Sequence, residues 1–120
     1  GDELDEYYFG GNTKTFVFDI SKLTAPSLTY TYRGITTAID HNGYVSGNLF
    51  YLSNYTAGLR VIDISNIQNN SMDEIMYFDT YPNHDISSFD GVWNAYPFFQ
   101  SGIIAISDTN TGLYLVKASD

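Results

Sequence analysis

The sequence of 120 residues contains no cysteine, which excludes disulfide bonds, thiolate metal sites and cysteine nucleophiles. Basic residues are scarce as well, since five Lys and Arg stand against 14 Asp and Glu, for a formal net charge of −9. A chain with this charge repels phosphate backbones, so we expect no nucleic-acid partner. Basic surfaces, amines and divalent cations are the partners that the charge favours.

Long apolar runs and known catalytic motifs are also missing. No stretch approaches the roughly 18 apolar residues of a membrane helix, so we expect no transmembrane segment. The first residues do not combine a basic segment with an apolar one, so an export signal is expected upstream of Gly1. The motifs G-x-S-x-G and H-E-x-x-H and a Gly-rich phosphate loop are absent, and the sequence therefore predicts no catalytic residue.

The sequence is rich instead in side chains that favour β-strands. Aromatic residues make up 17% of the chain, with 11 Tyr and 8 Phe, and Thr, Ile and Val are frequent. Aromatic and branched side chains pack well on a pleated surface, and no window shows a helical period. The composition therefore predicts an all-β fold.

An internal repeat organises the chain. Residues 16–21, Phe-Val-Phe-Asp-Ile-Ser, recur at 60–65 as Arg-Val-Ile-Asp-Ile-Ser. A weaker third copy at 111–116 aligns with residues 57–62. Residues 49–54 align with 103–108, and residues 42–45 align with 90–93. The register predicts one set of four strands, with turn residues between them, at 42–46, 49–53, 59–64 and 74–79. A period of about 40–50 residues with four short strands is typical of a β-propeller blade.

This register divides a single domain into three parts. Residues 1–35 would form the outer strands of an incomplete blade, residues 36–82 a complete blade, and residues 83–120 a final blade whose completeness stays open. The predicted fold is therefore a partial β-propeller of about two and a half four-stranded antiparallel blades. Missing blades of the same protein, or other chains, are expected to cover the open strand edges.

The Asp of the repeated strand has two interpretations. The carboxylates of Asp19 and Asp63 can each accept a backbone N–H just past the strand, as an Asx-type turn. A ligand-binding role is the alternative, and the repetition of the motif favours the structural role.

The repeated residues resemble a known family. Residues 57–65, Ala-Gly-Leu-Arg-Val-Ile-Asp-Ile-Ser, resemble the LVIVD repeat. The wider pattern resembles the choice-of-anchor B family of surface proteins, on the segments 1–6, 36–42, 53–60, 77–82, 89–94 and 107–108. The resemblance implies the C-terminal part of a secreted or surface-anchored bacterial propeller with no established activity. Two departures are a loop at 66–71 without the usual Pro and Lys117 in place of the repeat's Asp.

The acidic N-terminal segment is a candidate metal site. Calcium takes six to eight oxygen ligands, and the closely spaced carboxylates of Asp2, Glu3, Asp5 and Glu6 can supply several of them from a loop. The spacing does not match an EF-hand loop. The alternative is a solvated acidic loop, or one that pairs with Arg33 or Arg60.

A second candidate, for ligand binding, is Asp40-His41-Asn42, which precedes the first strand of a blade. In a propeller this strand lines the central channel, and a His beside a carboxylate can act as a base or a metal ligand. The favoured alternative is a His that bonds the backbone of a neighbouring loop.

Aromatic residues provide the third candidate. Exposed rings at Tyr96 and Phe98, with Trp93, Phe99 and Tyr81 nearby, would suit a carbohydrate face or a protein partner. The favoured alternative is that these rings seal the gap between blades. Trp93 itself is expected in the core, because the register aligns it with Val45.

Three functions compete on these observations. The first is a non-catalytic extracellular or cell-surface module for binding or scaffolding, with a protein or glycan partner. The second is a metal-dependent enzyme whose remaining site residues lie in missing blades. The third is a passive secreted cargo that is found with its export machinery. The sequence favours the first, with calcium as the candidate cofactor.

Overall fold

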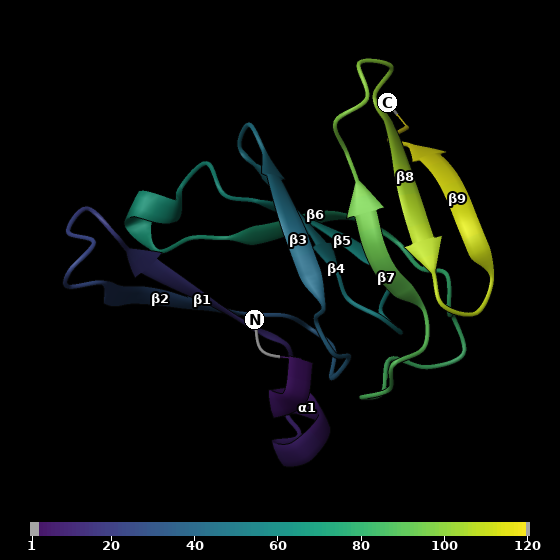
Figure 1. Ribbon diagram of the computed structural model, residues 1–120, viewed down its shortest axis with the longest axis horizontal. Coiled ribbons are helices and arrows are strands. Elements are labelled where there is room, and N and C mark those ends of the chain that lie inside the picture. Colours follow the sequence, from purple (N-terminus) through teal and green to yellow (C-terminus); the bar gives the residue numbers. More distant parts are fainter. Residues whose placement is uncertain (1–2, 120) are drawn as a thin grey trace.

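The computed structural model describes residues 3–119 as three antiparallel sheets and one short helix. Sheet A contains two strands, sheet B four in the order β3-β4-β5-β6, and sheet C three in the order β7-β8-β9. Figure 1 shows the sheets side by side, with sheet B between the other two. The strands are β1 (Lys14–Asp19), β2 (Ser27–Arg33), β3 (Asn42–Ser46), β4 (Leu49–Ser53), β5 (Leu59–Asp63), β6 (Asp73–Phe78), β7 (Val92–Tyr96), β8 (Ile103–Asp108) and β9 (Gly112–Lys117).

The all-β prediction is confirmed, and the four strands expected between 42 and 79 are the strands of sheet B. A 3-10 turn, η1 (Ile67–Asn69), fills the polar connection between β5 and β6. The repeat register is also confirmed for two strand pairs. Leu49 pairs with Asp63, and Ile103, its counterpart, pairs with Lys117. The aligned segments therefore occupy equivalent positions in sheets B and C.

The structural role of the repeated Asp is confirmed as well. The backbone N–H of Ser21 donates to Oδ1 of Asp19 at 2.8 Å, and that of Ser65 donates to Oδ1 of Asp63 at the same distance. These hydrogen bonds lower the pKa of both carboxyl groups, because they favour the charged form. Each Asp thus ends its strand with an Asx turn.

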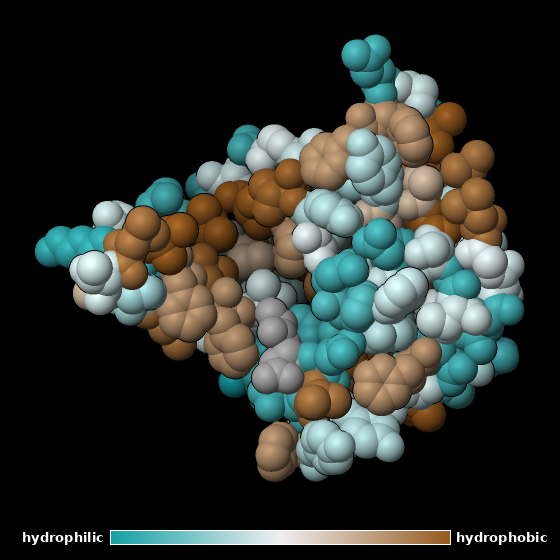
Figure 2. Space-filling view, viewed as in Figure 1, coloured by the Kyte–Doolittle hydropathy of each residue, from teal (hydrophilic) through white to brown (hydrophobic). Residues whose placement is uncertain are grey.

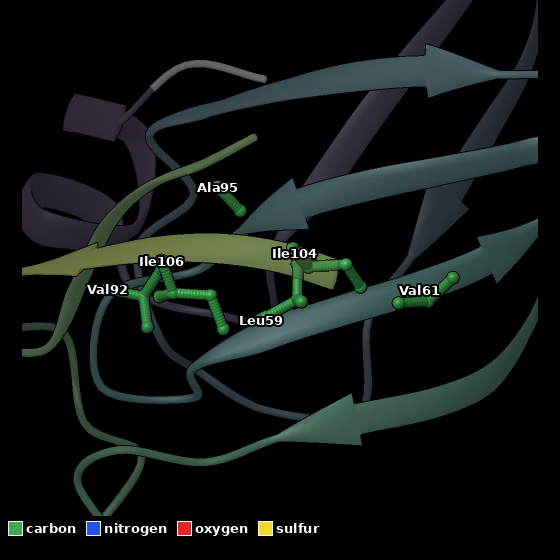
Figure 3. Packing of buried hydrophobic residues seen from close by; sticks show 6 residues of the cluster. All are labelled: Leu59, Val61, Val92, Ala95, Ile104 and Ile106. Carbon is green, nitrogen blue, oxygen red and sulfur yellow. The ribbon is translucent and has the colours of Figure 1, made fainter. Parts of the chain in front are cut away.

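The central sheet is buried on both faces. Leu59 and Val61 of β5 pack against Ile104 and Ile106 of β8, as Figure 3 shows, in a cluster that also includes Val92 and Ala95. On the opposite face, Leu52 and Ile62 pack with Tyr32 of β2 and with Met72. Residues of β5 alternate between the two clusters, since side chains of a strand point to opposite faces. Two separate cores therefore join sheet B to its neighbours.

The outward faces of sheets A and C carry exposed apolar residues. Phe16 and Phe18 of β1 are 38% and 52% exposed, and Leu113 and Leu115 of β9 are 69% and 64% exposed. In Figure 2, brown apolar residues gather over the β1–β2 arm at one end of the molecule and along the β8–β9 edge at the other. The outer faces of sheets A and C are thus apolar, like the faces that pack against sheet B.

From Glu3 onward the acidic segment is a helix, and the expectation of an acidic loop there is wrong. Helix α1 (Glu3–Phe9) places Glu3, Asp5 and Glu6 in its first turn, where carboxylates interact favourably with the helix dipole. The expected residue Asp2 lies outside the described residues. At seven residues the helix is too short to be recognised from a hydrophobic period. Among the described residues, no helix has the length and apolar character needed to cross a membrane.

The register expected for β7 is also wrong. Gly43 pairs with Leu52, and Ala95 pairs with Ile106, the counterpart of Leu52, so Ala95 is the true equivalent of Gly43. Within β7, a bulge between Val92 and Asn94 makes Trp93 an extra residue with no paired partner in β8. Trp93, the residue before Asn94, is 53% exposed, whereas Val92 is fully buried. The expectation that Trp93 lies in the core is therefore not met.

Candidate functional site

A cluster of polar and aromatic side chains lies where sheets B and C meet helix α1. It comprises Glu3 from α1, His41 just before β3, Tyr55 in the turn after β4, and Trp93 of β7. The His41 Nδ1 atom lies 2.8 Å from Oε2 of Glu3, and the Tyr55 hydroxyl lies 3.3 Å from the same oxygen. We call these four residues the junction cluster.

The segment before β3 holds His41 in place. The backbone N–H of His41 donates to the carbonyl of Ser53 at 2.9 Å, and the Asn54 side chain donates to the carbonyl of Ile39 at 2.9 Å. Asn54 is 3% exposed, so its hydrogen bonds are formed in the interior, where an unpaired amide is costly. The His41 ring contacts the side chain of Glu3 and not, as one alternative expected, the backbone of a neighbouring loop.

Tyr55 adopts an unusual backbone conformation. Its φ of +36° is in the left-handed region, which is strained for a bulky side chain. The strain is maintained by a bridge to the next sheet: the Tyr55 N–H donates to the carbonyl of Val92 at 3.1 Å, and the Val92 N–H donates back to Tyr55 at 3.0 Å. This backbone pair links sheets B and C and directs the Tyr55 hydroxyl to Glu3.

The environment of Tyr55 keeps its hydroxyl protonated. Burial, followed by the charge of Glu3 and the hydrogen bond to it, raises the pKa of Tyr55 to about 12. Near neutral pH the hydroxyl therefore acts as a hydrogen-bond donor to the Glu3 carboxylate, and it is not a source of a phenolate nucleophile.

Aromatic rings surround the polar contacts of the cluster. The rings of His41 and Trp93 are stacked with centroids 5.4 Å apart, and this contact joins the segment before β3 of sheet B to β7 of sheet C. Tyr55 contacts Phe89 edge to face at 5.5 Å, and Phe89 contacts Tyr7 of α1 at 5.3 Å. Since Trp93 and Phe89 are 53% and 42% exposed, the cluster presents aromatic surface to solvent.

Two carboxyl groups lie buried behind the cluster. Glu6 and Asp40 are 2% and 3% exposed. Burial, followed by the charge of Asp40, raises the pKa of Glu6, and no hydrogen-bond partner of Glu6 Oε2 is found among the described residues. Asp40, one of the predicted ligand contacts, is thus shielded from solvent in this structure, and its role in ligand binding stays a prediction.

We predict that Glu6→Gln stabilises the protein at pH 7 by about 1 kcal/mol, because it removes a buried charge beside another carboxyl group. A carboxyl group whose pKa is raised on folding binds its proton more tightly in the folded state. The free energy of unfolding therefore falls as pH rises from 4.5, the ordinary pKa of Glu, through the folded pKa. The gain from Glu6→Gln should therefore vanish below pH 4.5, the ordinary value for Glu. Urea unfolding at both pH values tests this, and an equal gain at both would contradict it.

The expected aromatic ligand residues form a second group. The ring of Phe98 lies 5.6 Å from that of Tyr44 in β3 and 5.3 Å from that of Tyr96, and Tyr96 also contacts Phe99 at 5.1 Å. These four rings are 37–48% exposed and bridge sheets B and C. Asn42, the other expected contact, is an exposed residue at the start of β3.

Within residues 3–119, no group of three or more His, Asp or Glu side chains is placed to hold a metal ion. Calcium binding by the acidic segment, which includes Asp2, stays a prediction. The alternative that Arg60 pairs with this segment is wrong. Arg60 is 6% exposed and donates to Glu74 at 3.1 Å and to the carbonyl of Ala57 at 2.7 Å.

A separate groove of about 660 Å³ lies between β1 and η1. Its lining includes Phe18, Asp19, Ile67, Gln68 and Asn70. Asp19 is engaged in the Asx turn described above, and the groove brings no titratable pair together. The junction cluster therefore offers the richer set of chemical groups.

Sequence reasoning placed Glu3 and His41 in two different candidate sites and did not select Tyr55. The structure brings Glu3 and His41 into direct contact and adds Tyr55 and Trp93. The relevant signal was the turn formed by residues 53–58, in which the backbone carbonyl of Asn54 accepts a hydrogen bond from the Ala57 N–H at 2.8 Å. Because β3 and β4 are paired, the turn that follows β4 lies beside the segment that precedes β3. Tyr55 in this turn is thereby brought close to His41.

Comparison with known protein families agrees with the prediction that the sequence contains an internal repeat. Residues 43–80, which cover nearly all of sheet B, match the LVIVD repeat model. No curated protein and no solved structure matches the chain. The chain thus contains a segment similar to the LVIVD repeat, within an all-β fold.

Proposed function

We propose that this repeat module is a non-catalytic binding or scaffolding unit of an extracellular or cell-surface β-propeller, related to the choice-of-anchor B proteins. The LVIVD match over residues 43–80 supports the repeat character. The net charge of −9 and the exposed aromatic residues support a role in contacting partners.

In this proposal the three sheets are successive blades. Residues 1–35 supply the outer strands of one blade, residues 36–82 a complete blade, and residues 83–120 a final one. The burial of both faces of sheet B supports this arrangement, because an inner blade packs against a neighbour on each side. The apolar faces around Phe18 and Leu115 are then covered by further blades of the same protein or by other chains.

The convergence of Glu3, His41, Tyr55 and Trp93 carries the functional proposal. These residues come from four separate segments, and one of them is held in a strained backbone conformation. Strain of this kind is concentrated at functional sites. The exposed ring of Trp93 gives the cluster a contact surface for a protein or a glycan, and the protonated Tyr55 favours binding over nucleophilic chemistry.

We predict that Trp93→Ala weakens binding of a partner by about tenfold or more, because exposed aromatic anchors dominate contact surfaces. The measurement is an array of glycans and envelope proteins probed with the wild type and the variant. Phe9→Ala is the matched control, since Phe9 is 83% exposed and lies outside the cluster. Equal binding by wild type and Trp93→Ala would contradict the proposed surface.

The remaining two functions predict other outcomes of the same experiments. A calcium ion that stays bound to the full-length protein after dialysis would favour the metal-dependent enzyme, with Asp2, Glu3, Asp5 and Glu6 as ligands. An absence of any partner in the array would favour the passive cargo.

A further inference from the structure

The hydrogen bonds of the junction cluster determine which groups it offers to a ligand. The Glu3 carboxylate can only accept, so the His41 Nδ1 atom at 2.8 Å must carry the hydrogen. The Tyr55 hydroxyl donates to the same carboxylate oxygen at 3.3 Å. In the neutral imidazole, Nε2 is then an acceptor. Carboxylate and imidazole thus both present acceptors, which suits a ligand with N–H donors.

The charge of the cluster also favours a cation. The Glu3 side chain is 40% exposed, and among residues 3–119 its one ion-pair partner is His41. Both hydrogen bonds from His41 and Tyr55 reach Oε2, and neither uses Oε1. An exposed carboxylate on a chain of net charge −9 attracts positive groups over several ångströms.

Trp93 supplies the third element. Its ring stacks on His41 and is 53% exposed, so part of the indole is open to solvent close to the Glu3–His41 contact. Indole is the best aromatic partner for a cation, because its π face is the most negative. A carboxylate, an imidazole acceptor and an exposed indole together match a primary ammonium group.

We propose that the junction cluster recognises the lysine side chain of a basic protein segment, with Glu3 as the counter-ion and Trp93 as the cation–π partner. This inference rests on the proposed binding function and names the chemistry of its partner. A basic protein fits better than a neutral glycan, since the acidic balance of the chain steers cationic surfaces towards it.

The test uses the fluorescence of Trp93, which is the single tryptophan of the sequence. The probes are a short oligolysine peptide and the same peptide with acetylated side chains, titrated at low and moderate salt. We expect acetylation to weaken binding by about tenfold or more, because it removes the positive charge. Equal binding of the two peptides would overturn the inference, and this arm requires no variant that must fold.

Two variants separate the site from the overall charge. Glu3→Gln should weaken oligolysine binding by about tenfold, whereas Asp73→Asn, which removes an exposed charge on β6, should change it by less than about threefold. Equal effects of the two variants would overturn the inference, as would tighter binding of a glucosamine oligomer than of oligolysine. A neutral array partner that is lost in Trp93→Ala but retained in Glu3→Gln would refute lysine recognition and leave the proposed function standing.

Discussion

Replacing Gly91 by Ala should destabilise the protein by about 3–4 kcal/mol. Gly91 has a φ of +90°, and a Cβ atom there would lie 2.3 Å from the backbone oxygen of Tyr55. The clash is with main chain, so the Tyr55–Val92 bridge must move, with a loss of about 1 kcal/mol for each of its hydrogen bonds. The positive φ adds about 1–2 kcal/mol for any L residue with a side chain. Urea unfolding measures the sum.

Gly112 provides the matched control for Gly91. Its φ is +94°, nearly the same, but a Cβ atom at Gly112 would meet nothing within 4 Å. Gly112→Ala should therefore cost only the conformational strain of about 1–2 kcal/mol. If the two variants lost equal stability, the contact between Gly91 and Tyr55 would have no energetic role, and the link between sheets B and C would need another explanation.

Replacing Ile62 by Ala is expected to cost about 3–4 kcal/mol, because the side chain is fully buried between sheets A and B. The lost methyl and methylene groups would leave a cavity beside Leu52 and Tyr32, in a core that joins two sheets. Thermal and urea unfolding of the variant measure the loss.

Ile75 of β6 is the control for this substitution. It is 49% exposed and belongs to neither of the two cores, so Ile75→Ala should cost about 1 kcal/mol or less. A similar loss for both Ile variants would contradict the picture of sheet B as a layer that is buried on both faces.

Much of the fold could be predicted from the sequence, because its signals are local. Strand positions followed from alternating and turn-forming residues, and the Asx turns at Asp19 and Asp63 followed from a repeated pattern. The pairing of Leu49 with Asp63 and of Ile103 with Lys117 agrees with the aligned repeats. Repetition made these predictions strong, since each repeat constrains the others.

The predictions that proved wrong concern elements whose structure depends on tertiary contacts and not on the local sequence pattern. Helix α1 is short, and contacts such as Tyr7 with Phe89 connect it to a distant loop. The β7 register depends on long-range pairing with β8, and the local likeness of Asp90-Gly91 to Asn42-Gly43 indicated a different register. One consequence was that Trp93 was expected in the core rather than beside His41.

The site was predicted only in parts. Glu3 and His41 were each selected for their chemistry, but their contact depends on the placement of α1, which a strand-based register does not provide. Tyr55 was missed because its role comes from a positive φ and a bridge to the next sheet. Both are properties of the assembled structure.

The central claim is that partners bind at the junction cluster, and NMR mapping of a bound partner tests it most directly. The partner selected by the wild-type chain in the array is titrated into ¹⁵N-labelled protein. We predict the largest shift changes at the Trp93 indole N–H and at the amides of His41 and Tyr55. Changes centred on Ile67 and Gln68 in the β1–η1 groove, with Trp93 unaffected, would contradict the claim.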